Sequence, residues 1–185
     1  MSDNGATLSG FELYKQETPM SCGAASARMV LSYLGMEVTE EELRGKMKLN
    51  KRIGILPFML KKGLNNILRE KGSELTAVEK SGEELPLQII KESLRDDRPV
   101  IASFLAENHF RPGTLVGHYS VIIGLDEDNN EIMLANPFGW EETMSVSEFK
   151  EKAAYDAGRE TPFAVKAGKF LGLLKPHTLW VLETG

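Results

Sequence analysis

The chain has 185 residues, of which 42% are hydrophobic and 26% are charged. This composition is typical of a soluble globular protein with room for one compact core. The formal net charge of −5 argues against a general nucleic-acid binder, which would carry a basic stripe. The sequence has no run of about 18 apolar residues, so it predicts no membrane span.

The first ten residues are small and polar. They lack the basic start and the apolar stretch of a secretory signal peptide. We expect residues 1–10 to form a flexible leader and residues 11–185 to form a single domain. We also expect a cytoplasmic protein, or one secreted by a route that uses no cleavable signal peptide.

The first half of the chain carries the spacing of amphipathic helices. Apolar residues recur at helical intervals, and Thr39 with Glu42 has the spacing of a capping box. Gly63 predicts a kink or interruption in the third helix, and Gly35 predicts the end of the first. The expected helices span about residues 21–34, 39–45, 57–70 and 86–96.

The second half is rich in β-branched and aromatic residues. It predicts strands at about residues 99–104, 118–125, 131–136, 141–146 and 178–182, with one helix over residues 147–157. A short turn at residues 126–130 joins two of these strands, so they should pair antiparallel. Helices followed by an antiparallel sheet indicate the α+β class.

Cys22 is the only cysteine, which excludes an internal disulfide framework and a zinc site of several thiolates. A lone thiol is either a buried structural group or a reactive one. Cys22 lies at the first turn of a predicted helix, where unpaired amides and the helix dipole stabilise a thiolate. The small residues after it, Gly23 to Ala25, would leave the sulfur accessible to a carbonyl group. Gln16, six residues earlier, is a candidate oxyanion donor together with the Cys22 backbone N–H.

Three histidines are candidates for the base beside the thiol. His118 opens the strongest predicted strand, and a rigid element holds a base better than a loop does. Asn136 ends the strand that should pair with it, so its carbonyl group can orient the imidazole. His109 lies in a predicted loop and His177 follows a proline, so we expect both to be structural or exposed to solvent. Trp140 is either a wall of the site or a core residue.

The segments Gln16-x5-Cys22-Gly23-x-Ala25, Gly117-His118-Tyr119-Ser120-Val121-Ile122-Ile123-Gly124 and Ala135-Asn136-Pro137 resemble those of the papain-like cysteine peptidases. The resemblance extends in particular to the bacteriocin-leader-processing peptidases and their stand-alone relatives. It implies a papain-like fold, with Cys22 as nucleophile, His118 as general base, Asn136 as orienting residue and Gln16 as oxyanion donor. Such a reaction uses no metal or organic cofactor.

Two residues differ from the leader-processing branch. Ser21 and Asn136 stand where that branch usually has acidic residues, which argues against cleavage at a double-glycine site and not against a thiol hydrolase. The expected partner is a peptide or protein substrate, with no nucleic acid and no membrane span, and the oligomeric state stays open. Two alternatives remain: a glutamine deamidase or acyltransferase with the same site, and an inactive binding module with the same fold.

Overall fold

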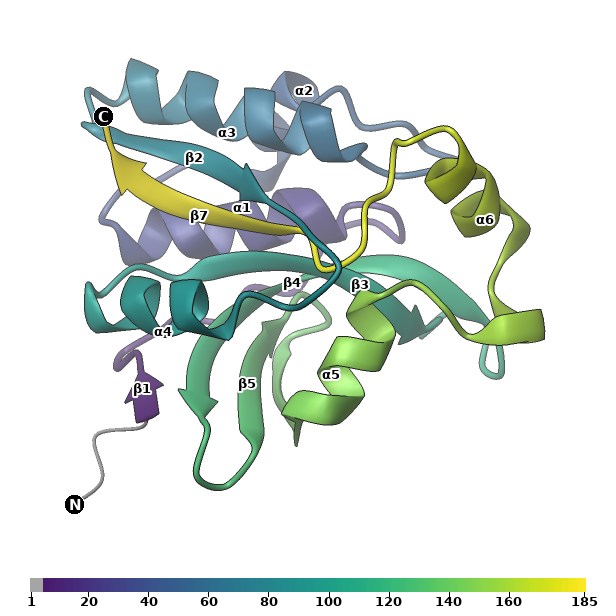
Figure 1. The fold of residues 1–185 in the computed structure, drawn as a ribbon. Helices are drawn as coiled ribbons and strands as arrows, with labels where there is room; N and C mark the ends of the chain where they lie inside the picture. Colours follow the sequence, from purple (N-terminus) through teal and green to yellow (C-terminus); the bar gives the residue numbers. More distant parts are fainter. Residues whose placement is uncertain (1–4) are drawn as a thin grey trace.

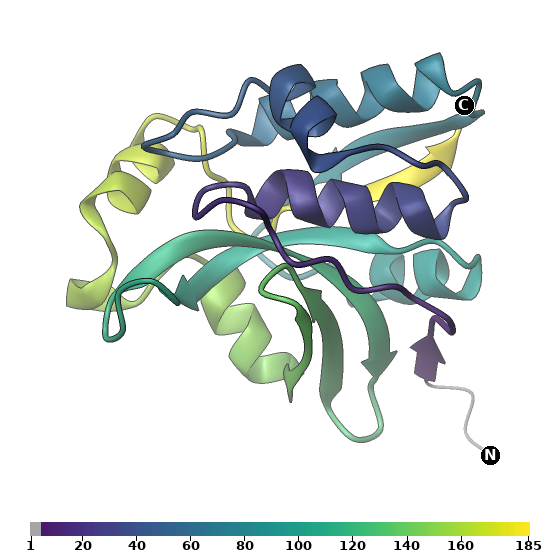
Figure 2. The ribbon, with the colours of Figure 1, turned by 180° about the vertical axis from the view of Figure 1, so that it is seen from behind.

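The computed structural model describes residues 5–185, apart from the side chain of Arg159. A twisted antiparallel sheet forms its centre, with α1 crossing one face and α4 and α5 lying on the other (Figures 1 and 2). The helical elements are α1 (Cys22–Tyr33), α2 (Glu40–Lys46), α3 (Pro57–Glu70), α4 (Leu87–Arg95), α5 (Val146–Ala153), η1 (Gly158–Glu160) and α6 (Phe163–Phe170). The strands are β1 (Gly5–Thr7), β2 (Leu75–Lys80), β3 (Val100–Glu107), β4 (Leu115–Asp126), β5 (Glu131–Asn136), β6 (Trp140–Ser145) and β7 (Leu179–Thr184).

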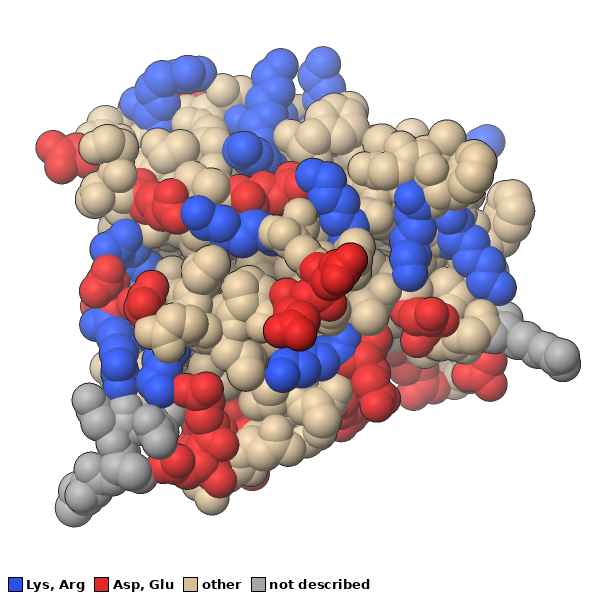
Figure 3. Space-filling model, in the orientation of Figure 1, with Lys and Arg blue, Asp and Glu red and all other residues tan. Residues whose placement is uncertain are grey.

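The sheet has the strand order β2-β7-β3-β4-β5-β6, and β1 pairs with the far end of β4. All of these pairings are antiparallel, including the predicted pairing of β4 with β5. The α+β class is therefore confirmed. No helix of the described residues is long and apolar enough to cross a membrane. Acidic and basic side chains are mixed over the face drawn in Figure 3, so the net negative charge does not gather there.

The predicted helices and strands of the first and second halves are present, with ends shifted by a few residues. The largest shift for the site concerns His118. Strand β4 begins at Leu115, so His118 lies inside the strand, opposite Phe104 of β3, and does not open it. The pairing with β3 holds the backbone of His118 in the sheet.

The kink predicted at Gly63 is wrong, because α3 is one continuous helix. Gly63 instead allows close packing between α3 and the end of α2. A Cβ atom at Gly63 would lie only 2.4 Å from Cγ of Met47. The glycine is therefore explained by a tertiary contact and not by a change in helix direction.

Three segments differ from the sequence-based expectation. Residues 5–7 of the expected flexible leader form β1 against β4, and Leu8 is buried; residues 1–4 lie outside the described part. Strand β2 is an unpredicted edge strand whose partner, β7, comes from the other end of the chain. Helix α6 is also unpredicted, and much of its apolar surface is exposed.

The core fixes the start of α1 against the sheet. Ala24, Ala27 and Leu31 of this helix are completely buried in the core that α1 shares with the strands. A Cβ atom at Gly23 would lie 3.1 Å from the Tyr119 ring. Because Gly23 follows Cys22 and Tyr119 follows His118, this close approach brings the two segments of the candidate site together.

Candidate active site

Cys22 is the first residue of α1, and a tight loop leads into it. Within this loop the Thr18 backbone N–H donates to Ser21 Oγ at 3.0 Å, and the Ser21 hydroxyl donates to the Thr18 carbonyl at 2.8 Å. Ser21 is completely buried, and its side chain does not cap the helix. The amides at the start of α1 therefore remain available to the Cys22 sulfur and to a substrate.

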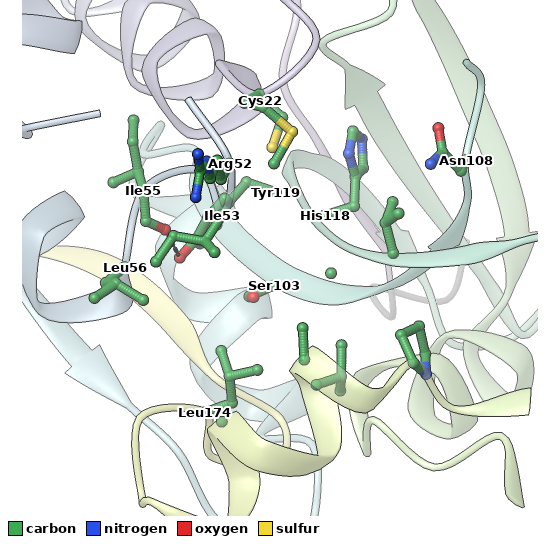
Figure 4. Close-up of a pocket in the computed structure, with 18 of the residues that line it drawn as sticks. Cys22, Arg52, Ile53, Ile55, Leu56, Ser103, Asn108, His118, Tyr119 and Leu174 are labelled. Atoms are coloured by element: carbon green, nitrogen blue, oxygen red, sulfur yellow. Dashed lines mark hydrogen bonds between the residues drawn. The ribbon is translucent and has the colours of Figure 1, made fainter. Parts of the chain in front are cut away.

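The electrostatics of Cys22 differ from the expected thiolate. Burial raises the pKa of the Cys22 thiol above its usual value, and hydrogen bonds from the backbone of Tyr119, Gly23 and Cys22 itself act in the opposite direction. Burial is the larger effect, so the resting thiol keeps its proton at neutral pH. Cys22, His118 and Tyr119 all line the same cleft (Figure 4).

The structure brings His118 and Asn136 together, as the strand pairing predicts. His118 Nε2 lies 3.2 Å from Asn136 Oδ1, and both residues are almost completely buried. Cys22 and His118 line the same cleft, where the close-up shows the thiol and the imidazole on one wall (Figure 4). The thiol and the imidazole thus line the cleft, while the Asn136 carboxamide contacts the imidazole from outside the lining.

Glu142 determines which way the Asn136 amide points. The Asn136 Nδ2 group donates to Glu142 Oε2 at 2.8 Å, and the Phe138 backbone N–H donates to Asn136 Oδ1 at 3.0 Å. An ionised carboxylate only accepts hydrogen bonds, so the amide nitrogen faces Glu142 and the carbonyl oxygen faces His118. His118 Nε2 must then carry the proton, which leaves the Nδ1 lone pair to accept a proton from the thiol.

Two aromatic rings enclose the His118 imidazole. Phe138 stacks on it with centroids 4.9 Å apart, and Phe104 meets it edge-on at 5.7 Å. Burial lowers the pKa of His118 to about 4, although the hydrogen bond with Asn136 acts in the opposite direction. The imidazole is therefore neutral at neutral pH and able to act as a base.

Gln16 lies at the edge of the same cleft and is mostly buried. Its backbone N–H donates to the Pro137 carbonyl at 2.7 Å, which ties it to the turn after Asn136. Its Nε2 group donates one hydrogen bond to the Thr18 carbonyl at 2.7 Å. Within the described residues, the other N–H of this amide has no partner and is available to an oxyanion.

Sequence reasoning missed Glu40, which supports the loop before Cys22. The Glu40 side chain is completely buried at the start of α2, and its carboxylate oxygens accept the Glu17 backbone N–H at 3.0 and 3.2 Å. Arg44 lies 3.8 Å from the same carboxylate. Burial raises the pKa of Glu40, and the hydrogen bonds from the Glu17 backbone act in the opposite direction. An acidic residue at a helix start is common, so the sequence alone does not distinguish this one.

The other candidate residues have different surroundings. His177 is buried away from the cleft, and its ring nitrogens lie 3.1 and 3.2 Å from the carbonyl oxygens of Gly82 and Lys150. His109 is exposed and packs against Phe138 and Trp140. Trp140 is exposed and does not line the main cleft. No group of three or more histidine, cysteine or acidic side chains in the described residues could hold a metal ion.

Comparisons with known proteins identify the family and the fold of the chain. The sequence model of the peptidase C39-like family matches residues 8–161. No curated protein matches the chain. Among solved structures, a C39-like peptidase from Bacillus anthracis has a TM-score of 0.64 at 13% identity, with 98% of each chain covered.

Two further structures have the same fold. The peptidase domain of Streptococcus ComA, a bifunctional ABC transporter, has a TM-score of 0.61 at 16% identity and covers 95% of this chain and 99% of its own. A double-glycine motif protease from an AMS/PCAT transporter, solved with its leader peptide, has a TM-score of 0.60 at 16% identity and covers 97% and 99%.

Proposed function

The chain belongs to the peptidase C39-like family of papain-like cysteine peptidases, and from this premise we propose that Cys22, His118, Asn136 and Gln16 cleave a peptide bond. The orientation of the His118 ring is the observation that carries the proposal. Glu142 turns the Asn136 amide, Asn136 selects the imidazole tautomer, and the tautomer leaves a proton acceptor beside the only thiol.

The reaction begins with a neutral thiol and a neutral imidazole. As the Cys22 sulfur attacks the substrate carbonyl carbon, its proton moves to His118 Nδ1. The free N–H of the Gln16 amide and the Cys22 backbone N–H stabilise the negative charge that forms on the carbonyl oxygen. The positive charge on the imidazole is stabilised by Asn136 Oδ1.

The tetrahedral intermediate then collapses to a thioester, and water hydrolyses this thioester in a second reaction. The carbon–nitrogen bond breaks, the imidazolium gives its proton to the leaving amine, and a thioester remains on Cys22. A water molecule, deprotonated by His118, attacks this thioester and releases the carboxylic acid and the thiol. Asn136 keeps the ring in one orientation for both steps. A peptide substrate is supported by the related transporter protease that was solved with a leader peptide.

Product analysis separates this proposal from the alternatives with the same fold. The wild-type chain and Cys22→Ala are incubated with a proteome-derived peptide mixture, while new N-termini and free ammonia are measured. We expect new N-termini that depend on Cys22. Ammonia without new N-termini would indicate a deamidase, and the absence of both would indicate a binding module.

A further inference from the structure

The cleft extends well beyond the reacting groups. Its volume is about 710 Å³, within the range of sites that enclose a whole ligand. Cys22 and His118 lie at one side, and Leu174 and the end of α6 lie across the cleft from them (Figure 4). The cleft can therefore hold several substrate side chains in addition to the bond that reacts.

The wall opposite the cysteine, here the α6 wall, consists of residues 162–174. Val165 packs under the helix against Leu105 and Tyr155. A Cβ atom at Gly168 would lie 2.8 Å from Cδ1 of Leu174, so the segment after α6 folds back tightly onto the helix. Lys169 Nζ donates to the Ala154 carbonyl at 3.1 Å. These contacts hold the wall against the rest of the fold. The wall lies beyond the part of the chain that matches the family model, which ends at residue 161.

Exposed large apolar side chains of the described residues line part of this cleft: Ile53, Phe110, Leu171 and Leu173. Phe163 and Phe170 are exposed on the same helix, α6, but they are not among the lining residues. An exposed apolar surface of this extent marks a place where another molecule binds.

The charged residues that line the cleft all have the same sign. Lys51, Arg52 and Arg111 line it, and no acidic residue of the described part does. None of the three forms an ion pair with a carboxylate of the described residues, and all three are exposed. On a chain with a net charge of −5, whose charges are mixed over the face in Figure 3, this lining selects for a ligand with negative charge.

We infer that the cleft binds a protein segment in which large apolar side chains are flanked by acidic residues. The apolar side chains contact the α6 wall, and the acidic residues pair with Lys51, Arg52 and Arg111. A membrane surface fits less well, because these cations line a cleft that a bilayer does not enter. As a statement about substrates, this inference rests on the proposed peptidase function.

Binding to the full-length Cys22→Ala chain tests the inference without turnover. Four fluorescein-labelled peptides of equal length are compared. Their apolar positions carry either Leu and Phe or only Ala, and their flanking charged positions carry either Glu or Lys. Fluorescence anisotropy measures the affinity of each peptide. We expect the Glu/Phe peptide to bind most tightly. Replacing Leu/Phe by Ala should weaken binding by roughly ten- to hundredfold. Replacing Glu by Lys should weaken it by about two- to fivefold per charge, less at high salt.

Matched variants locate the two contributions. Arg111→Glu should remove part of the preference for Glu over Lys, whereas Lys62→Glu, the same charge reversal on an exposed residue of α3 outside the cleft lining, should not. Ala167→Trp, which fills the cleft from α6, should reduce binding of the Leu/Phe peptides only. Leu174→Ser provides a second variant of this wall if Ala167→Trp does not fold.

Several results would overturn the inference. One is equal affinity for all four peptides, and another is a preference for the Lys peptides. A third is binding to phosphatidylserine vesicles that is lost in Phe163→Ser/Phe170→Ser while none of the peptides binds. Selective binding by Cys22→Ala without cleavage by the wild type would instead overturn the proposed peptidase function and leave the binding site standing.

Discussion

The cleft has two walls that differ in how their side chains are satisfied. The cysteine wall, formed by the start of α1 and by β4, holds buried polar groups such as His118, only 2% exposed. Behind this wall, His118 is hydrogen-bonded to Asn136, and Asn136 in turn donates to Glu142. The α6 wall instead leaves Phe163 and Phe170 at 85% and 91% exposure. The comparison suggests that one wall is preorganised for chemistry and the other is left open for a partner.

The largest expected effect is the loss of kcat/KM on removal of His118, compared with removal of His177, a buried histidine away from the cleft. His118→Ala should lower kcat/KM by about a thousandfold, because His118 is the histidine that lines the cleft with Cys22. His177→Ala should keep kcat/KM within about twofold, yet lower the free energy of unfolding by ~1–3 kcal/mol, because a buried ring and its contacts with the Gly82 and Lys150 carbonyls are lost. Peptide cleavage assays and urea unfolding would measure both. Equal kcat/KM for the two variants would contradict the assignment.

The second prediction concerns pH. His118 acts in its neutral form, and its pKa is lowered to about 4. We therefore expect kcat/KM to be at its maximum above this pH and to fall as the pH drops through it. Asn136→Ala should lower kcat/KM by about a hundredfold and move this acid limb to lower pH, because the Asn136 hydrogen bond raises the pKa.

A charge-balanced control tests the same point from the opposite direction. Asn136→Asp/Glu142→Gln moves the carboxylate next to the imidazole while keeping the net charge. A neighbouring negative charge raises the pKa of His118, so the acid limb should move to higher pH. If both variants leave the acid limb in place, His118 is not the group that titrates.

A smaller effect is expected where the cysteine wall is supported from behind. Glu40→Ala removes the buried acceptor of the Glu17 backbone N–H and loosens the loop that carries Gln16 and leads to Cys22. We expect a loss of ~1–3 kcal/mol in the free energy of unfolding and about a tenfold lower kcat/KM. Glu41→Ala, an exposed acidic residue of the same helix, is the matched control and should change neither by much. A lower stability with unchanged kcat/KM would limit Glu40 to a purely structural role.

The smallest effect is expected on the α6 wall. Phe163→Ser/Phe170→Ser should change the free energy of unfolding by less than ~0.5 kcal/mol, because both rings are exposed. Phe149→Ala, at a completely buried ring of α5, should cost ~3–5 kcal/mol. Thermal and urea unfolding compare the two. A large loss in the α6 variant would show that these rings pack within the fold and are not left for a partner.

The cysteine wall could be predicted from the sequence because its parts leave local signals. A helix start at Cys22, a strong strand through His118 and a short turn before Asn136 fix their relative positions with little help from the rest of the chain. The roles of Glu40 and Glu142 could not be predicted in this way. Each depends on a contact made by packing, and many exposed acidic residues share the same local pattern.

The α6 wall had weaker signals. The apolar residues of α6 do not divide into one buried and one polar face, since Phe163 and Phe170 are exposed while Val165 is buried. Strand β2 was missed because its pairing with β7 joins segments about a hundred residues apart. The lowered acidity of the Cys22 thiol was also missed, because burial is a tertiary property that outweighs the local effect of the helix start.

The most direct test of the central claim is to trap the acyl group on the chain during turnover. The wild type is mixed with a peptide thioester that carries large apolar and acidic residues, quenched in acid after a short time, and digested for mass spectrometry. The account predicts an acyl adduct on Cys22 in the wild type and a much slower adduct in His118→Ala. An adduct on another residue, or undiminished cleavage by Cys22→Ala, would contradict it.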